Sequence, residues 1–264
     1  MKNDLSFAIY AIKKNIQGSA ELRTSFLTNV IGMMINNTAF ILLWVFFINA
    51  VGQIGGWTPA DIIGLNGFAA LTYGLAFSTF YGIRKMPDYA ATGAFDRFML
   101  SPKNLLVRVS TSAFSTSAVG DVLFGIVCLG IFSFLIHTNI IQLALLLILA
   151  FAACLVFIST IIIIYSIGFL FTDGNNVSEG IFQLFFTPAM FDGGAYQGGM
   201  RLIFTFIIPS LLIGTMPIEA IKDLSFVKAT LVVGLSAVWF LLSILIFNRS
   251  VKKYESSNFM TFGN

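Results

Sequence analysis

The sequence is short of charge. Only 10% of its 264 residues are Asp, Glu, Lys or Arg, whereas 57% are apolar. Soluble domains carry roughly 25% charged residues, so this chain has too little charge to cover a surface that faces water. Most of its surface must meet lipid or other protein, and the sequence therefore predicts an all-α integral membrane protein.

Catalytic and metal-binding motifs are also missing. The sequence contains no GxxxxGK[ST] phosphate-binding loop, no HExxH pair and no serine-nucleophile elbow, so we expect no catalytic site and no cofactor on this chain. The single His, His137, has no partner at metal-ligand spacing, and we expect no metal site. Cys128 and Cys154 both lie in apolar runs, which favours inert buried thiols over a disulfide.

Six apolar stretches approach the roughly 20 helical residues that cross a bilayer core of about 30 Å. We place these six transmembrane helices at about 26–50, 61–82, 109–136, 141–171, 173–191 and 229–247. A GGAYQGG break and two prolines, Pro209 and Pro217, follow the fifth stretch and predict a re-entrant extracellular segment over 192–222, with short helices at about 198–222. An alternative puts an interfacial helix first and the fifth span at 199–216.

The N-terminal residues show a different pattern. In the segment 5–17, the apolar side chains fall on one helical face and Lys13, Lys14 and Gln17 fall mostly away from it; the apolar set is Leu5, Ala8, Ile9, Ile12 and Ile16. Such a segment is too short and too charged to span, so residues 1–24 are expected to form an amphipathic helix on the membrane surface, without a cleaved secretory signal.

Basic residues gather on one side of the predicted spans. They precede the first span, fill the loop at 83–108 and follow the last span, whereas the loop at 52–60 has none. The positive-inside rule therefore places both termini and the 83–108 loop in the cytoplasm. The net charge of +3 reflects this topology, and we expect no nucleic-acid partner.

The 83–108 loop is neither polar nor featureless. Gly93 and Pro102 bracket a short helix that Pro102 would end. We expect this helix to expose Phe95, Phe98 and Met99, a surface that needs a partner protein. The alternative, in which the helix merely lies on lipid headgroups, is equally compatible with these residues.

The run GAFDRFMLSP at 93–102 resembles the GxLDxxLLxPL loop of bacterial type 2 ABC transporter permeases, in the less-characterised branch with a separate ATPase subunit. Phe95 stands where the family usually has Leu, and Ser101 where many members have Arg. The run Ile207-Ile208-Pro209 and the pair Met216-Pro217 that follows it resemble the proline-marked extracellular re-entrant segment of that family. With the amphipathic start and the six spans, the resemblance covers nearly the whole chain.

The resemblance implies one permease domain over 1–264 that exports a substrate across the bacterial cytoplasmic (inner) membrane by alternating access. A connecting helix in 1–24 and a coupling helix in 83–108 would contact an ATP-binding subunit, present in two copies, which would bind ATP and Mg. A second permease, identical or related, would complete the pathway. The implied ATPase-coupling residues are Gly93, Phe95, Asp96, Arg97, Phe98, Leu100 and Pro102, and the implied re-entrant gate residues are Pro209 and Pro217.

A few polar residues lie within the predicted spans. Asp121 is the one acidic residue well inside a span, on a stripe of small residues that includes Ser117 and Gly125. Asn36 and Asn37 lie midway along the first span. Each of these polar residues could be a packing group within the subunit or a group that lines the pathway or the permease–permease seam, and both interpretations stay open.

Two other functions compete with export. An ion-coupled secondary transporter would use intramembrane charges and often shows inverted repeats, but this chain has one buried Asp and no visible repeat. A lipid-modifying membrane enzyme would need a polar catalytic cluster that the sequence does not supply. For an exporter, the many Phe and Met residues suggest a hydrophobic or amphipathic substrate such as a drug, peptide or lipid.

Overall fold

The computed structural model describes residues 2–52 and 55–254, and all regular secondary structure in that part is helical. Five of the described helices are long and apolar enough to cross a membrane. They are α2 (Arg23–Val51), α3 (Pro59–Thr79), α7 (Ser117–Leu135), α8 (Ile140–Gly168) and α12 (Phe226–Lys252). Residues 1, 53–54 and 255–264 of the predicted 1–264 domain lie outside the described part.

The predicted start of the third span, at 109, is wrong. A separate helix, α6 (Leu105–Ser110), ends there, and α7 begins only at Ser117. The intervening sequence is rich in Ser and Thr, whose hydroxyls bond nearby carbonyls and compete with a continuous helix. Thr111 Oγ1 donates to the Val107 carbonyl at 2.8 Å, and Ser112 Oγ donates to the Val109 carbonyl at 2.8 Å.

The predicted fifth span corresponds to α9 (Gly174–Ala189), which has 16 residues. A helix of that length is about 24 Å long, short of a bilayer core of about 30 Å, so a sixth span stays a prediction. Short helical pieces follow. The turn η2 (Gly193–Ala195) comes before the range 198–222 in which short helices were predicted. That range contains α10 (Gly198–Leu202), the π-helical turn η3 (Ile203–Ile207), η4 (Pro209–Leu212) and α11 (Thr215–Lys222). Their re-entrant position in a membrane also stays a prediction.

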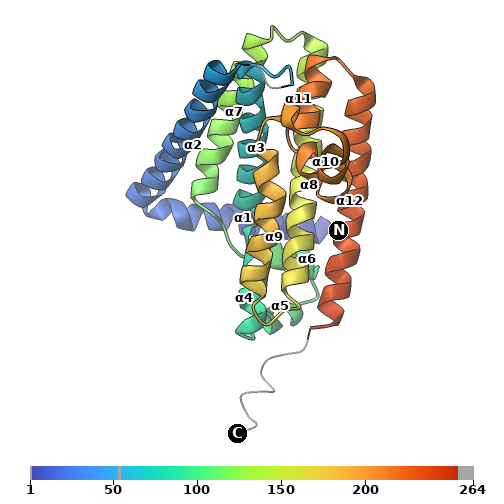
Figure 1. Cartoon of the computed structure of the whole chain (residues 1–264). Coiled ribbons are helices and arrows are strands. Elements are labelled where there is room, and N and C mark those ends of the chain that lie inside the picture. Colours follow the sequence, from blue (N-terminus) through green and yellow to red (C-terminus); the bar gives the residue numbers. More distant parts are fainter. Residues whose placement is uncertain (1, 53–54, 255–264) are drawn as a thin grey trace.

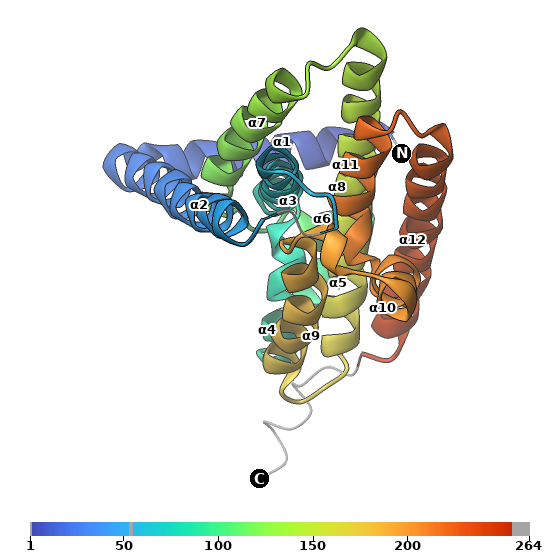
Figure 2. The ribbon, with the colours of Figure 1, turned by 45° about the horizontal axis from the view of Figure 1, so that its top comes forward.

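The long helices lie side by side in one bundle (Figures 1 and 2). Helix α3 lies between α7 and α8, α12 packs on α8, and α2 packs mainly on α7. The turn η1 (Tyr81–Lys85) and the helices α4 (Met86–Ala91), α5 (Asp96–Met99) and α6 form one end of the bundle, whereas α10 and α11 lie towards the other (Figure 1). The loop rich in basic residues and the end of α12 therefore share one end.

The N-terminal helix α1 (Lys2–Glu21) runs across the bundle rather than along it (Figure 1). Its predicted apolar face is largely uncovered, because Leu5 is 67% and Ile9 60% exposed. Asn15 Nδ2 donates to the Thr111 carbonyl at 2.9 Å and so fixes α1 to the segment between α6 and α7. The predicted helix is confirmed, and its place on a membrane surface stays a prediction.

Glycines allow α3 and α7 to approach closely. A Cβ added at Gly74 would lie 2.6 Å from the Val122 nitrogen, and one at Gly125 would lie 2.6 Å from the Leu71 nitrogen. Gly120 faces α2 in the same way, with the Val30 carbonyl oxygen 2.5 Å from such a Cβ. The predicted small-residue stripe of α7 is thus a packing surface for both neighbours.

Candidate functional site

A cavity of about 290 Å³ lies between α2, α3, α7 and α9. Ligand pockets generally begin at roughly this size and pair apolar walls with a few polar groups. The walls include aromatic side chains of all four helices. The polar residues at the cavity are Asn36, Asn37, Asn66, Tyr73, Arg84, Asp121 and Gln183.

The structure brings Asn36, Asn37 and Asp121 together at this cavity. Asn37 Nδ2 donates to Asp121 Oδ1 at 2.7 Å and joins α2 to α7. Asp121 is 2% exposed, and its second oxygen, Oδ2, has no hydrogen-bond partner among the described residues. Ser117, which shares the stripe of Asp121, is not at the cavity; its hydroxyl lies 3.2 Å from the Ser115 hydroxyl.

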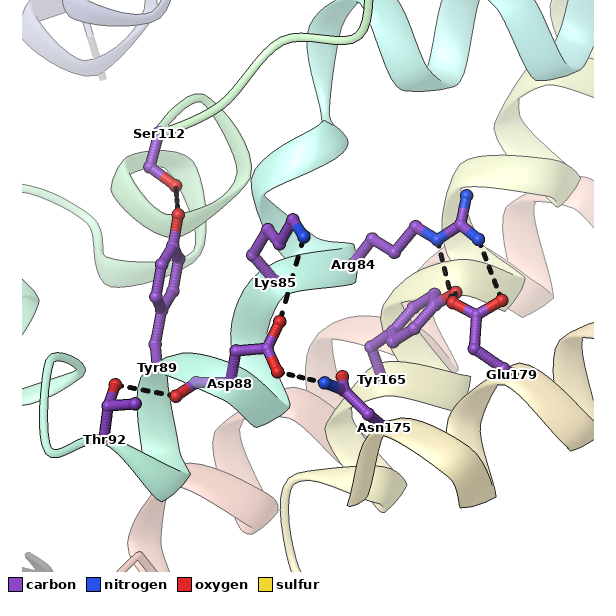
Figure 3. A network of polar contacts seen from close by, with 9 residues as sticks. All are labelled: Arg84, Lys85, Asp88, Tyr89, Thr92, Ser112, Tyr165, Asn175 and Glu179. Carbon is purple, nitrogen blue, oxygen red and sulfur yellow. Dashed lines mark hydrogen bonds and ion pairs between the residues drawn. The ribbon is translucent and has the colours of Figure 1, made fainter. Parts of the chain in front are cut away.

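Arg84 connects the cavity with the end of the bundle that carries the 83–108 loop. Its Nε and Nη2 donate to the two carboxylate oxygens of Glu179 at 2.8 Å each, and Tyr165 donates to the same carboxylate at 2.9 Å (Figure 3). Burial is the largest single influence and lowers the pKa of Arg84, but the hydrogen bonds to Glu179, together with the electrostatic attraction of Tyr165, Tyr73 and Glu179, raise that pKa above its usual value. Arg84 therefore remains charged and fixes η1 to α9.

A second set of contacts joins α4 to the same neighbours. Asn175 of α9 donates to the Asp88 carboxylate, and Lys85 lies 3.9 Å from that carboxylate (Figure 3). On the other side of α4, the Tyr89 hydroxyl lies 3.2 Å from the Ser112 hydroxyl (Figure 3). The start of the 83–108 loop is thus bound to α9 and to the segment before α7.

The predicted exposure of Phe95 and Phe98 is wrong. Phe95 is 0% and Phe98 7% exposed, because the loop folds over an apolar cluster that includes aromatic side chains from other parts of the chain. The Phe95 ring lies 4.7 Å from the Phe169 ring and 5.0 Å from the Tyr254 ring. These two Phe residues stabilise the loop, so an ATP-binding subunit could not contact them in this conformation.

Of the three side chains that were expected to be exposed, only Met99 is exposed. Met99 is 52% and Leu100 87% exposed, and Arg97 and Pro102 are exposed beside them. Arg108 supports this surface by donating to the carbonyls of Phe98 and Arg97. Gly93, which has a φ of 70°, precedes the short helix α5. The half-buried Asp96 is the first residue of that helix. The coupling role of these residues stays a prediction.

The predicted gate prolines lie in the broken segment and are both buried. Pro209 begins η4, where Ser210 Oγ donates to the Phe185 carbonyl of α9 at 2.6 Å. Pro217 lies in the first turn of α11, whose Lys222 binds Asp61 of α3 at 2.7 Å. The contacts hold the segment against α3 and α9, and a gating role for either proline stays a prediction.

Sequence reasoning missed the Arg84–Glu179 pair. Arg84 counted only as one of the charges that set the topology, and Glu179 is the one acidic or basic residue within α9. A lone carboxylate in an apolar helix indicates a buried partner. The partner itself is 95 residues away, so the pairing is visible only in the fold.

The comparison with protein families matches residues 33–258 to the ABC-2 family transporter protein family, and the chain belongs to this family. It is thus a multi-pass membrane permease of the ABC transporter class, and the resemblance to type 2 ABC permeases is confirmed. Permeases of this family are transport components that normally work with an ATP-binding subunit. No curated protein and no solved structure matches the chain.

Proposed function

We propose that this chain is the membrane-spanning subunit of an ATP-driven exporter whose ATPase is a separate polypeptide. The observation that carries the proposal is the family match over residues 33–258. The exposed Met99 and Leu100, at the end of the bundle with the most basic residues, support it, because two apolar side chains there suit a protein contact. ATP and Mg would bind to the partner, in two copies.

The contacts of the 83–108 loop suggest how force would reach the pathway. An ATP-binding subunit that presses on Leu100 would move α5 and, through the loop, α4 and η1. Because Arg84 and Asp88 bind α9 through Glu179 and Asn175, α9 would follow, and α9 forms a wall of the cavity. A second permease, identical or related, would close the pathway opposite. The cargo would be hydrophobic or amphipathic and would move outward by alternating access.

The proposal places the chain in the bacterial cytoplasmic membrane with both termini and the 83–108 loop inside. Support comes from the shared position of the basic loop and of the end of α12, which carries Arg249 and Lys252. The segment 192–222 would then lie outside, as a re-entrant element.

Affinity purification of the tagged chain from its native membrane tests the proposal. An ATP-binding subunit should co-purify, and vesicles reconstituted with the complex should export cargo only with ATP. Replacing Asp96 and Arg97 together should leave the complex assembled and hydrolysing ATP while transport falls. Transport that needs an ion gradient and no nucleotide would instead identify a secondary transporter and refute the proposal.

A further inference from the structure

One carboxylate oxygen of a residue that lines the cavity has no hydrogen-bond partner among the described residues. Asp121 Oδ1 accepts the hydrogen bond of Asn37, but Oδ2 is buried and accepts none from the described residues. A buried carboxylate oxygen without a partner is costly, and a site that retains one gains when a ligand supplies the missing charge or donor. Asp121 is among the residues that line the cavity, so a ligand there would lie close to this carboxylate.

The neighbouring charges do not compensate Asp121. Arg84 is the cation at the same cavity, and its guanidinium is already held by both oxygens of Glu179. The ion pairs found among the described residues include none to Asp121. The cavity therefore has one net negative charge when Asp121 is ionised.

The apolar walls suit a cation as well. Phe40, Phe124, Phe182 and Phe186 line the cavity together with Tyr73. Aromatic faces attract organic cations through the ring quadrupole, more strongly where water is excluded. A carboxylate among aromatic rings is thus a recognition site for a positively charged, partly apolar molecule.

Asp121 differs from two other buried aspartates because it lines this cavity. Asp61 and Asp192 also have one buried carboxylate oxygen without a partner. Asp61 is paired with Lys222 at 2.7 Å. Asp192, like Asp121, accepts one hydrogen bond, in its case from the Gly194 amide at 2.8 Å, so it differs from Asp121 in its position. Neither lies at the cavity between α2, α3, α7 and α9.

We propose that this cavity binds an organic monocation, an amphipathic ammonium or phosphonium compound, and that the Asp121 carboxylate, positioned by Asn37, recognises its charge. The inference rests on the proposed function, since it takes the cavity as part of the transport pathway, and it narrows the cargo to cationic amphiphiles. The aromatic walls would contact the apolar part of the compound.

Binding of radiolabelled tetraphenylphosphonium to the purified chain in lipid nanodiscs, without nucleotide, tests the site. Tetraphenylborate is the matched probe, because it has the same shape and the opposite charge. Beyond the uptake of each probe by empty nanodiscs, wild type should bind the cation and not the anion. Asp121→Asn should weaken cation binding by more than about tenfold, the effect of removing one member of a buried charge pair. Asp121→Glu should keep most of the binding.

Asp192→Asn is the matched control, a buried aspartate away from the cavity. It should bind the cation as wild type does. Equal binding of both probes to wild type, or unchanged cation binding in Asp121→Asn, would overturn the inference. The assay needs no ATPase, so these outcomes leave the proposed function intact, whereas failure to recover an ATP-binding subunit would count against the proposed function and leave the measured cation binding standing.

Discussion

At the scale of single residues, Glu179 has two partners. Its carboxylate accepts from both the Arg84 guanidinium and the Tyr165 hydroxyl, so it joins η1, α8 and α9. The Arg84 side chain is 27% and the Glu179 side chain 37% exposed, so solvent screens the pair in part. Most of its strength comes from the two-point geometry.

Glu179→Gln should lower the free energy of unfolding by about 1–2 kcal/mol, because the bidentate charged hydrogen bonds become weaker single ones. Thermal unfolding of the purified protein in one detergent measures this. Lys85→Gln, at the residue that follows Arg84, is the control. The pair of Lys85 with Asp88 spans 3.9 Å between exposed side chains and should contribute less than about 0.5 kcal/mol. Equal losses in the two variants would contradict the special role of Glu179.

The run at 93–102 contains both buried and exposed side chains. Phe98→Ala should cost about 2–4 kcal/mol of stability, since it empties a space between the Tyr89 and Phe95 rings. Leu100→Ala removes a side chain that is 87% exposed and should leave the unfolding temperature unchanged while ATP-driven transport falls. Paired measurements of unfolding and of transport separate the two effects, and a Leu100→Ala variant with full transport would remove Leu100 from the coupling surface.

At the scale of elements, the close contact between α3 and α7 depends on glycine. Gly125→Ala should destabilise by about 1–3 kcal/mol, because the new methyl group would meet the Leu71 backbone, which cannot rotate away. Gly130 lies on the same helix with nothing within 4 Å of an added Cβ. Gly130→Ala should therefore be neutral or stabilise by up to about 1 kcal/mol. Thermal unfolding compares the two, and similar effects would disprove the packing argument.

The sequence predicted elements better than their contacts. Apolar length placed α2, α3, α8 and α12 correctly, because a bilayer imposes that length whatever a helix packs against. Apolar length failed at 109–116, where local hydroxyl bonds end a helix. The exposure of Phe95 and Phe98 was predicted wrongly for another reason, because their burial depends on Phe169 and Tyr254 far along the chain. The pathway candidates Asn37 and Asp121 were found separately, and only the fold shows that they are bonded.

At the scale of the whole molecule, the two ends of the bundle should face different compartments. A cysteine at Ile140, 83% exposed at the start of α8, should react with a membrane-impermeant maleimide in intact cells. A cysteine at Leu100 should react only after the membrane is opened. Cys128 and Cys154 are buried and provide a low background. Labelling of the Leu100 variant alone in intact cells would show that the orientation is the reverse.

The aromatic cluster under the 83–108 loop includes a ring from the other end of the chain. Tyr254 follows α12 and lies 5.0 Å from both the Phe95 and Phe169 rings. A genetic screen for transport-deficient alleles should therefore recover changes at Tyr254 alongside changes in the loop. Such alleles would have the phenotype of a lost contact with the ATPase, although their direct effect would be weaker packing of the 83–108 loop. Affinity tags for assays of this protein are for the same reason best kept apart from Tyr254 by a long linker.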